Sequence, residues 1–200
     1  MATATTVLLG FGGITATVGD HIAHFYKGLD QRFSVLGPYF AEGIRRKDQC
    51  VFISSPEVAD QLCEWLTSSG LNAAEACTTG QLILHPGEGN SDDMRALVDR
   101  IEADSLHAGH PFVRWAGDAG WALSGRISVC EMLRWEALYD KCSVGWKILA
   151  LCQFDLAVFG GDVVMDALRS HPLCVIGQVV VPNPFHVSPE TLLQELQECE

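Results

Sequence analysis

The sequence predicts an α/β protein with a mainly parallel sheet and helices on both faces of the sheet. Strand-like runs alternate with segments of helical periodicity along most of the 200 residues. The strand-like runs are almost continuously apolar, which is typical of strands buried on both faces. The composition, 48% hydrophobic and 19% charged, can fill one such core and excludes a largely disordered chain.

Six strands are expected from runs rich in β-branched and aromatic residues. They cover 21–26, 50–54, 81–85, 111–116, 147–154 and 173–181. Between them, apolar residues recur at intervals of three and four, which is the spacing of one buried helix face. This spacing predicts helices over about 33–44, 58–66, 91–101, 132–139 and 162–170.

A last helix is expected to begin at Ser188, with Ser188 as the N-cap and Pro189 in the first turn. Its Leu192, Leu193 and Leu196 form an apolar stripe. This stripe is expected to dock on the body of the protein, or to face a partner or a second subunit. A homodimer is therefore left open.

The charge balance limits the classes of partner. There are 13 Lys and Arg residues against 25 Asp and Glu residues, a formal net charge of −12. Such a field repels the phosphates of nucleic acid and the surface of an acidic membrane. No apolar run approaches the roughly 20 residues that span a bilayer, and the segment MATATTVLLGFGG has no positive signal-peptide region.

The eight cysteines indicate a reducing compartment. No pair is spaced as CxxC, so neither a zinc ribbon nor a thioredoxin-type motif is supported. Most lie in apolar runs, where a free cysteine behaves as a small hydrophobic residue. We expect unpaired thiols and a cytoplasmic protein.

Sites for phosphate or nucleotide are not expected. The pattern GxxxxGK[ST] is absent, so the chain has no functional P-loop. The segment Gly10-Phe11-Gly12-Gly13 loosely resembles a dinucleotide turn, but Thr15 stands where the third glycine belongs.

Catalytic motifs are equally weak. Ser124 is not part of a GxSxG elbow. A pair such as Cys152 and His171 stays open, although an apolar setting raises a thiol's pKa and lowers its reactivity. We therefore expect a protein that is not an enzyme.

His21 and His24 form an HxxH pair, which could hold a metal ion on a helix but not on a strand, where the two side chains point to opposite faces. Because we expect a strand, no metal site is predicted there. One histidine should face the core or a ligand and the other should face outside.

Ligands of open α/β sheets bind beyond the carboxyl ends of the strands. Residues at these ends are Tyr26, Ser54, Ser55, His85, Gly117, Asp118, Gln153 and Asp155. Asp118 could place a carboxylate over the crevice, with Trp121 as an apolar wall, or the two could be a turn residue and a core residue. Asp155 could likewise hold a metal ion, bind a small ligand or cap a turn.

The order of several short segments resembles a known family. The segments are His21-Ile22, Phe25-Tyr26, Phe40-Ala41-Glu42-Gly43, Cys50–Ile53, Gly117–Leu123, Trp135-Glu136, Cys152–Asp155, His171-Pro172 and Asn183-Pro184-Phe185. Together they resemble the MEDS family, the methanogen/methylotroph sensory domain of the dichloromethane-responsive repressor type. The resemblance covers residues 18–196. Residues that match the family pattern are His21, Tyr26, Gly117, Asp118, Trp121, Glu136, Cys152, Asp155 and His171.

The resemblance implies a degenerate, three-layer RecA/KaiC-like domain that senses small molecules such as hydrocarbon derivatives and controls an output domain. We expect residues 18–200 to form one such domain and residues 1–17 to be an N-terminal extension. Because no helix-turn-helix or kinase segment is recognised, the sensor should act in signalling or transcription through a separate output protein.

We expect the ligand-binding residues to be His21, Phe25, Tyr26, Asp118, Trp121, Cys152, Asp155 and His171. Two alternatives stay open. One is an interaction module that antagonises a kinase or a sigma regulator. The other is a metal- or cofactor-binding protein or enzyme that uses His21, His24, Cys152 and His171. The ligand and any cofactor are not identified by the sequence.

Overall fold

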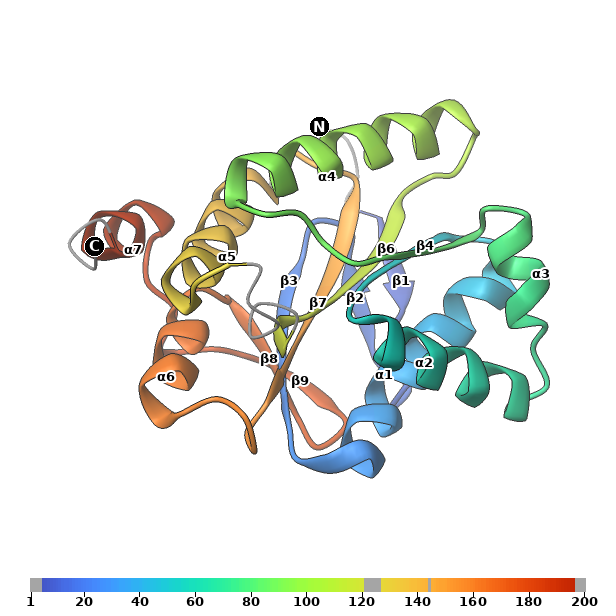
Figure 1. Ribbon diagram of the computed structural model, residues 1–200, viewed down its shortest axis with the longest axis horizontal. Helices are drawn as coiled ribbons and strands as arrows, with labels where there is room; N and C mark the ends of the chain where they lie inside the picture. The colour runs from blue at the N-terminus through green and yellow to red at the C-terminus, as the bar shows by residue number, and fades with distance from the viewer. Residues whose placement is uncertain (1–4, 121–126, 144, 197–200) are drawn as a thin grey trace.

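A seven-stranded sheet of order β5-β4-β6-β7-β3-β8-β9 forms the centre of the computed structural model (Figure 1), which describes residues 5–120, 127–143 and 145–196. The strands are β3 (His21–Tyr26), β4 (Gln49–Ile53), β5 (Leu82–His85), β6 (Val113–Asp118), β7 (Ile148–Asp155), β8 (Leu173–Ile176) and β9 (Val179–Pro182). All neighbouring strands are parallel except β8 and β9, which are antiparallel.

Helices cover both faces of this sheet (Figure 1). They are α1 (Gly28–Arg46), α2 (Pro56–Ser68), α3 (Ala73–Thr78), α4 (Ser91–His107), α5 (Val129–Ser143), α6 (Gly161–Arg169) and α7 (Pro189–Leu196). The helices α1 to α3 pack on one face, and α4 to α7 pack on the other. The predicted three-layer α/β architecture is confirmed.

The central strands are apolar on both faces because each face meets a helix. In β4, Cys50 and Phe52 pack in the α1–α2 core, whereas Val51 and Ile53 pack in the core under α4. All four are buried. This explains why the run reads as continuously apolar rather than alternating.

The chain departs from the predicted elements near its two ends and at α3. The single strand expected over 173–181 is two strands, β8 and β9, because Gly177 takes a left-handed conformation with φ of 64° and reverses the chain. A hairpin of β1 (Thr6–Leu8) and β2 (Thr15–Thr17) was not expected, nor was α3. Leu9 and Phe11 beside this hairpin are buried in the core that α1 covers.

The last helix starts as predicted. The Ser188 hydroxyl accepts a hydrogen bond from the backbone N–H of Thr191 at 3.2 Å. Leu192 and Leu196 are buried in the core formed with α5, so this apolar stripe docks on the body of the protein. No helix within the described ranges is long and apolar enough to cross a membrane.

Candidate functional site

The predicted ligand-binding residues do not share one crevice, because the sheet separates them. His21, Cys152 and His171 meet under α5, whereas Tyr26 and Asp118 lie on the α1 face. Phe25 borders an apolar pocket near the β8–β9 hairpin. Trp121 falls outside the described residues.

A buried cluster of four metal-ligating types lies beneath α5. It consists of His21, Glu136, Cys152 and His171, and we call it the His–Glu–Cys cluster. One ligand atom from each lies within 4.8 Å of all the others, and all four residues are buried. Glu136 Oε2 is 3.3 Å from His21 Nε2 and 3.4 Å from His171 Nε2, and Cys152 Sγ is 3.4 Å from His21 Nε2.

Strand register brings two of these side chains together. His21 pairs with Ala150, so Cys152, two residues further along β7, has its side chain on the same face as His21. Glu136 is a buried position of α5, and His171 lies between α6 and β8. His21 is the first residue of β3 and His171 precedes β8, so both lie at the amino ends of strands, whereas the ligand was expected beyond the carboxyl ends.

The Nε2 atom of His171 faces the cluster without a hydrogen-bond partner. The Nδ1 atom of the same ring lies 2.7 Å from the carbonyl oxygen of Ala167 and 3.0 Å from the Ser170 hydroxyl, and because a carbonyl only accepts, the contact with Ala167 assigns the proton to Nδ1. In the neutral ring, Nε2 is then a bare acceptor that faces the Glu136 carboxylate. This Nε2 is buried and has no hydrogen-bond partner.

Asp140 and His186 connect the cluster to the surface. Asp140 Oδ1 is 3.6 Å from His21 Nδ1, and Asp140 Oδ2 is 2.8 Å from His186 Nε2. A surface pocket of about 480 Å³ is lined by residues that include His21, Asp140 and His186. The cluster is thus buried but borders a route from solvent.

The two histidines respond differently to this surrounding. Burial lowers the pKa of His21, but the adjacent Asp140 and Glu136 raise it more, so the pKa is raised overall. The pKa of His171 is lowered, first by burial and then by the nearby His21. Burial opposes the charge on Glu136, yet the contacts that His171 and His21 make with it, which stabilise the carboxylate when the histidines are protonated, hold the pKa of its carboxyl below the usual value.

Cys152 does not have the properties of a nucleophile. Burial, and then the charge of Glu136, raises the pKa of its thiol well above the usual value. A nucleophilic cysteine needs the opposite shift. The open pairing of Cys152 with His171 is therefore present in space but is not an activated catalytic pair.

A second polar group lies across the sheet, at the carboxyl ends of β3 and β6. Arg32 of α1 forms a buried ion pair of 2.6 Å with Asp118 and lies 5.0 Å above the Tyr26 ring. His24 bonds to Gln153 at 3.1 Å on the same face. His21 and His24 are both buried, so the expectation that one faces outside is wrong, because helices cover both faces of the sheet.

Asp155 caps a turn, which is one of the roles considered for it. Its Oδ1 accepts a hydrogen bond of 2.8 Å from the backbone N–H of Ala157. The carboxylate thereby fixes the chain as it leaves β7.

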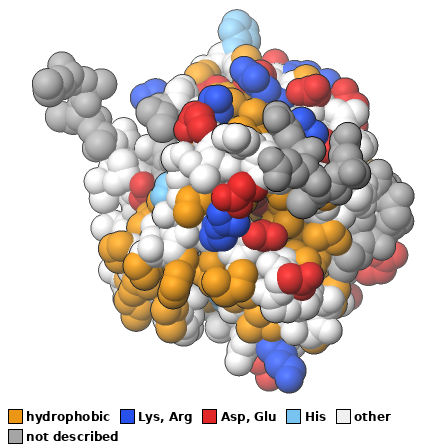
Figure 2. All heavy atoms as spheres, turned by 90° about the vertical axis from the view of Figure 1, so that its left-hand side faces the viewer, with side chains coloured by type: hydrophobic (Ala, Val, Ile, Leu, Met, Phe, Trp, Pro, Cys, Tyr) orange, Lys and Arg blue, Asp and Glu red, His pale blue; other side chains and the backbone are white. Residues whose placement is uncertain are grey.

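An apolar pocket of about 610 Å³ opens beside the β8–β9 hairpin. Its lining includes Phe25, Cys174, Ile176, Val181, Asn183 and Phe185. Figure 2 shows apolar side chains gathered on the lower part of the face that carries α6 in Figure 1. Asn183 Nδ2 donates to the carbonyl of His171 at 2.7 Å, so one pocket residue is bonded to a cluster residue.

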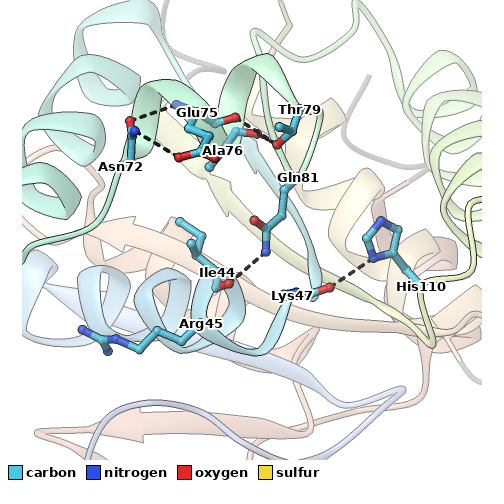
Figure 3. Close-up of a pocket in the computed structure, with 9 residues that line it drawn as sticks. All are labelled: Ile44, Arg45, Lys47, Asn72, Glu75, Ala76, Thr79, Gln81 and His110. Carbon is cyan, nitrogen blue, oxygen red and sulfur yellow. Dashed lines mark hydrogen bonds between the residues drawn. The ribbon is translucent and has the colours of Figure 1, made fainter.

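Another pocket lies near the amino end of β5 (Figure 3). Its polar side chains mainly bond to neighbouring groups: Gln81 donates to the Ile44 carbonyl at 2.9 Å, and His110 lies 3.2 Å from the Lys47 carbonyl. These contacts join the C-terminal end of α1 to the residue before β5 and to the segment before β6. The groups that converge here are therefore tied to the backbone rather than presented to a ligand.

Glu136 was recognised from the family pattern but not among the predicted ligand-binding residues, and Asp140 and His186 were missed. The available signal is the spacing on α5. Met132, Glu136 and Tyr139 belong to one buried helix face, so a carboxylate interrupts an otherwise apolar stripe. Charged residues are almost never fully buried unless they are paired.

The sequence matches the family model described as "MEthanogen/methylotroph, DcmR Sensory domain" over residues 20–172. A curated relative, the transcriptional repressor DcmR of Methylorubrum extorquens (strain DSM 6343 / CIP 106787 / DM4), is 27% identical over 161 residues. The match covers 80% of this chain and 60% of the relative. The chain thus spans less than two thirds of that repressor's length.

Solved structures share the fold at low sequence identity. The KaiC-like protein PH0186 from Pyrococcus horikoshii OT3 aligns with a TM-score of 0.62 and 11% identity, over 86% of this chain and 79% of the other. The flagellar accessory protein FlaH from Methanocaldococcus jannaschii aligns with a TM-score of 0.50 and 8% identity, over 81% and 75% of the two chains. The RecA/KaiC-like architecture is therefore established, and these likenesses concern the fold alone.

Proposed function

Because this chain belongs to the MEDS family of sensory domains, we propose that it binds a small apolar molecule and passes that event to a separate output protein in transcriptional control. The DcmR relative is a transcriptional repressor. The observation that carries the ligand class is the apolar pocket beside the β8–β9 hairpin. Its volume of about 610 Å³ falls within the range of small-molecule sites.

The chemistry of the pocket favours hydrocarbon derivatives. Phe25 and Phe185 offer ring surfaces, and Val181 and Ile176 add aliphatic area. Asn183 supplies a polar group at the wall, although its amide already bonds to the Leu168 and His171 carbonyls. A compact apolar ligand with at most one polar substituent fits this lining.

The position of the pocket suggests how occupancy would be transmitted. The hairpin ends the sheet, and Phe185 and Ile176 are exposed at 56% and 66%. Ligand binding would bury these side chains and favour one arrangement of the hairpin. An output protein that contacts the hairpin or α6 would then meet a different surface in the bound state.

The proposal is tested by thermal unfolding of the full chain with a panel of dichloromethane, short hydrocarbons and monocyclic aromatics. A ligand at 100 times its Kd should stabilise the fold by about 2.7 kcal/mol, or roughly 5–10 °C. Phe185→Ser should remove the shift. Leu29→Ser is the matched control, because Leu29 is similarly exposed at 54% but lies on α1 outside this pocket.

Two results would contradict the proposal. One is the absence of stabilisation by every compound in the panel. The other is an equal shift for the wild type and for Phe185→Ser, which would place any bound compound elsewhere.

A further inference from the structure

The His–Glu–Cys cluster has more acceptors than protons to share among them. The Nδ1 proton of His171 is engaged by Ala167, so Nε2 points a lone pair at Glu136 Oε2 from 3.4 Å. The same carboxylate oxygen lies 3.3 Å from His21 Nε2. An extra proton on His21 would satisfy its contact with Glu136, but it would leave the His171 nitrogen unpartnered.

A cation at the centre would satisfy all four groups. Zn²⁺ binds imidazole and carboxylate at about 2.0–2.2 Å and thiolate at about 2.3 Å, so the edges of a tetrahedral site are about 3.3–3.8 Å long. The three close contacts in the cluster measure 3.3, 3.4 and 3.4 Å. No distance between the ligand atoms of the four residues exceeds 4.8 Å.

The surrounding residues also resemble the outer shell of a metal site. Metal-bound histidines usually donate the other ring N–H to a carboxylate or a backbone carbonyl. His171 Nδ1 meets the Ala167 carbonyl at 2.7 Å, whereas His21 Nδ1 is buried without a hydrogen-bond partner and has Asp140 Oδ1 as a neighbouring carboxylate oxygen at 3.6 Å. Both rings thus direct Nε2 inward, and the pocket at Asp140 and His186 gives access from solvent.

We propose that His21, Glu136, Cys152 and His171 bind one divalent transition-metal ion, with Zn²⁺ as the ion that this donor set fits best. Binding replaces the Cys152 thiol proton, which passes to solvent, and involves no redox change. The four protein ligands close the site, so the ion clamps α5 and the segment before β8 onto β3 and β7. This proposal does not rest on the sensory one, because it concerns residues outside the apolar pocket.

The site revises the expectation drawn from the HxxH pair. His21 takes part, but His24 points to the opposite face and bonds to Gln153. The other ligands come from β7, α5 and the α6–β8 connection. The four ligands are far apart in the sequence, so they do not form a motif that could be recognised by its spacing.

The test uses the full chain, stripped with a chelator and titrated with Co²⁺. We expect one equivalent to bind, with a thiolate-to-cobalt charge-transfer band and the intense visible bands of tetrahedral cobalt, and Zn²⁺ should displace it. Cys152→Ser should remove the charge-transfer band. Cys174→Ser should keep it, because Cys174 is a buried thiol in the same core but outside the cluster.

Two histidine variants extend the test to the imidazole ligands. His171→Gln should weaken Co²⁺ binding at least 100-fold, whereas His24→Gln, on the same strand as His21, should bind like the wild type. Asp140→Asn should weaken binding about 10- to 100-fold, as outer-shell changes do.

Failure is also defined by the wild type, so it does not depend on a variant that folds poorly. A wild-type chain with no stoichiometric, tetrahedral cobalt spectrum would overturn the proposal. An unchanged spectrum in a folded Cys152→Ser or His171→Gln chain would overturn it as well.

Discussion

Two buried polar groups lie on opposite faces of the sheet: the Arg114–Asp48 ion pair and the His–Glu–Cys cluster. They differ in the balance between hydrogen-bond donors and acceptors. On the α1 face, Arg114 donates to Asp48 Oδ2 through Nε at 3.1 Å and Nη2 at 2.9 Å, and to the Leu8 carbonyl at 3.0 Å. Arg114 has donors in excess, since its Nη1 has no partner. The His–Glu–Cys cluster has acceptors in excess.

This difference separates a structural ion pair from a site. The charges of Arg114 and Asp48 neutralise each other, and the guanidinium also lies 4.9 Å from the Tyr39 ring. The pair needs no additional ion. The cluster combines a carboxylate with imidazole lone pairs, so it needs protons or a cation, and a donor set that can hold a cation is a functional candidate.

The largest change in the free energy of unfolding is expected from breaking the Arg114–Asp48 ion pair. Asp48→Ala leaves the fully buried Arg114 without its carboxylate and should lower the free energy of unfolding by about 3–5 kcal/mol. Urea unfolding followed by circular dichroism measures this loss. A loss below about 1 kcal/mol would show that solvent reaches Arg114 and that the pair is not a buried one.

The next effect belongs to the cluster. Zn²⁺ at 1,000 times its Kd should stabilise the wild-type chain by about 4 kcal/mol against unfolding. Cys174→Ser should respond equally and His171→Gln only weakly, as measured by urea unfolding with and without the metal. Equal stabilisation of all three chains would mean that the ion binds outside the His–Glu–Cys cluster. The cluster would then be a structural polar group like the Arg114–Asp48 pair.

The free energy of unfolding is expected to depend on pH through His24, which lies near the buried Arg32–Asp118 ion pair. Burial, and then the charge of Arg32, lowers the pKa of His24 to about 4, although Gln153 opposes this shift. As the pH falls, His24 therefore binds a proton near pH 6.5 in the unfolded chain but only near pH 4 in the folded chain. The stability that the folded state owes to neutral His24 is fully present above pH 6.5. It is lost as the pH falls toward 4, and the total loss in the free energy of unfolding is about 3 kcal/mol.

The measurement for His24 is the free energy of unfolding between pH 7 and pH 4, for the wild type and for His24→Gln. The variant should lose about 3 kcal/mol less over this range. Parallel curves would mean that His24 is accessible to solvent protons in the folded state.

The smallest effect is expected for an exposed ion pair that links α6 and α7. Arg169 Nη2 lies 2.7 Å from Glu195 Oε2, and half of the Glu195 side chain is exposed. Glu195→Gln should cost less than about 1 kcal/mol, because water screens such pairs. A cost as large as that of Asp48→Ala would show that burial does not govern the energetics of these groups.

The elements of the core could be predicted because each one has a local cause. The apolar run Cys50–Ile53 indicates a buried strand, and Ser188-Pro189 indicates a helix start. The turn at Gly177 was missed because the strand-forming residues on both sides of it continue the same apolar pattern. The hairpin at the N-terminus was missed because three-residue strands carry almost no periodicity.

The candidate site could be predicted only in part. His21, Cys152 and His171 were identified through the family pattern, but they were assigned to the same crevice as Tyr26 and Asp118. Which residues share a face depends on strand register, and register is a property of paired strands. Trp121, which was expected to form the apolar wall, lies outside the described residues.

The sequence by itself determined the layered α/β fold, the absence of a P-loop and the acidic surface, because composition and periodicity are local quantities that any chain displays before it folds. The tertiary structure alone decided which polar residues meet. It placed Glu136 against two histidines and a thiol from distant segments and put Arg114 beside Asp48 on the other face. Contacts within 4 Å between residues more than 100 positions apart, such as His21 and Cys152, arise only from packing.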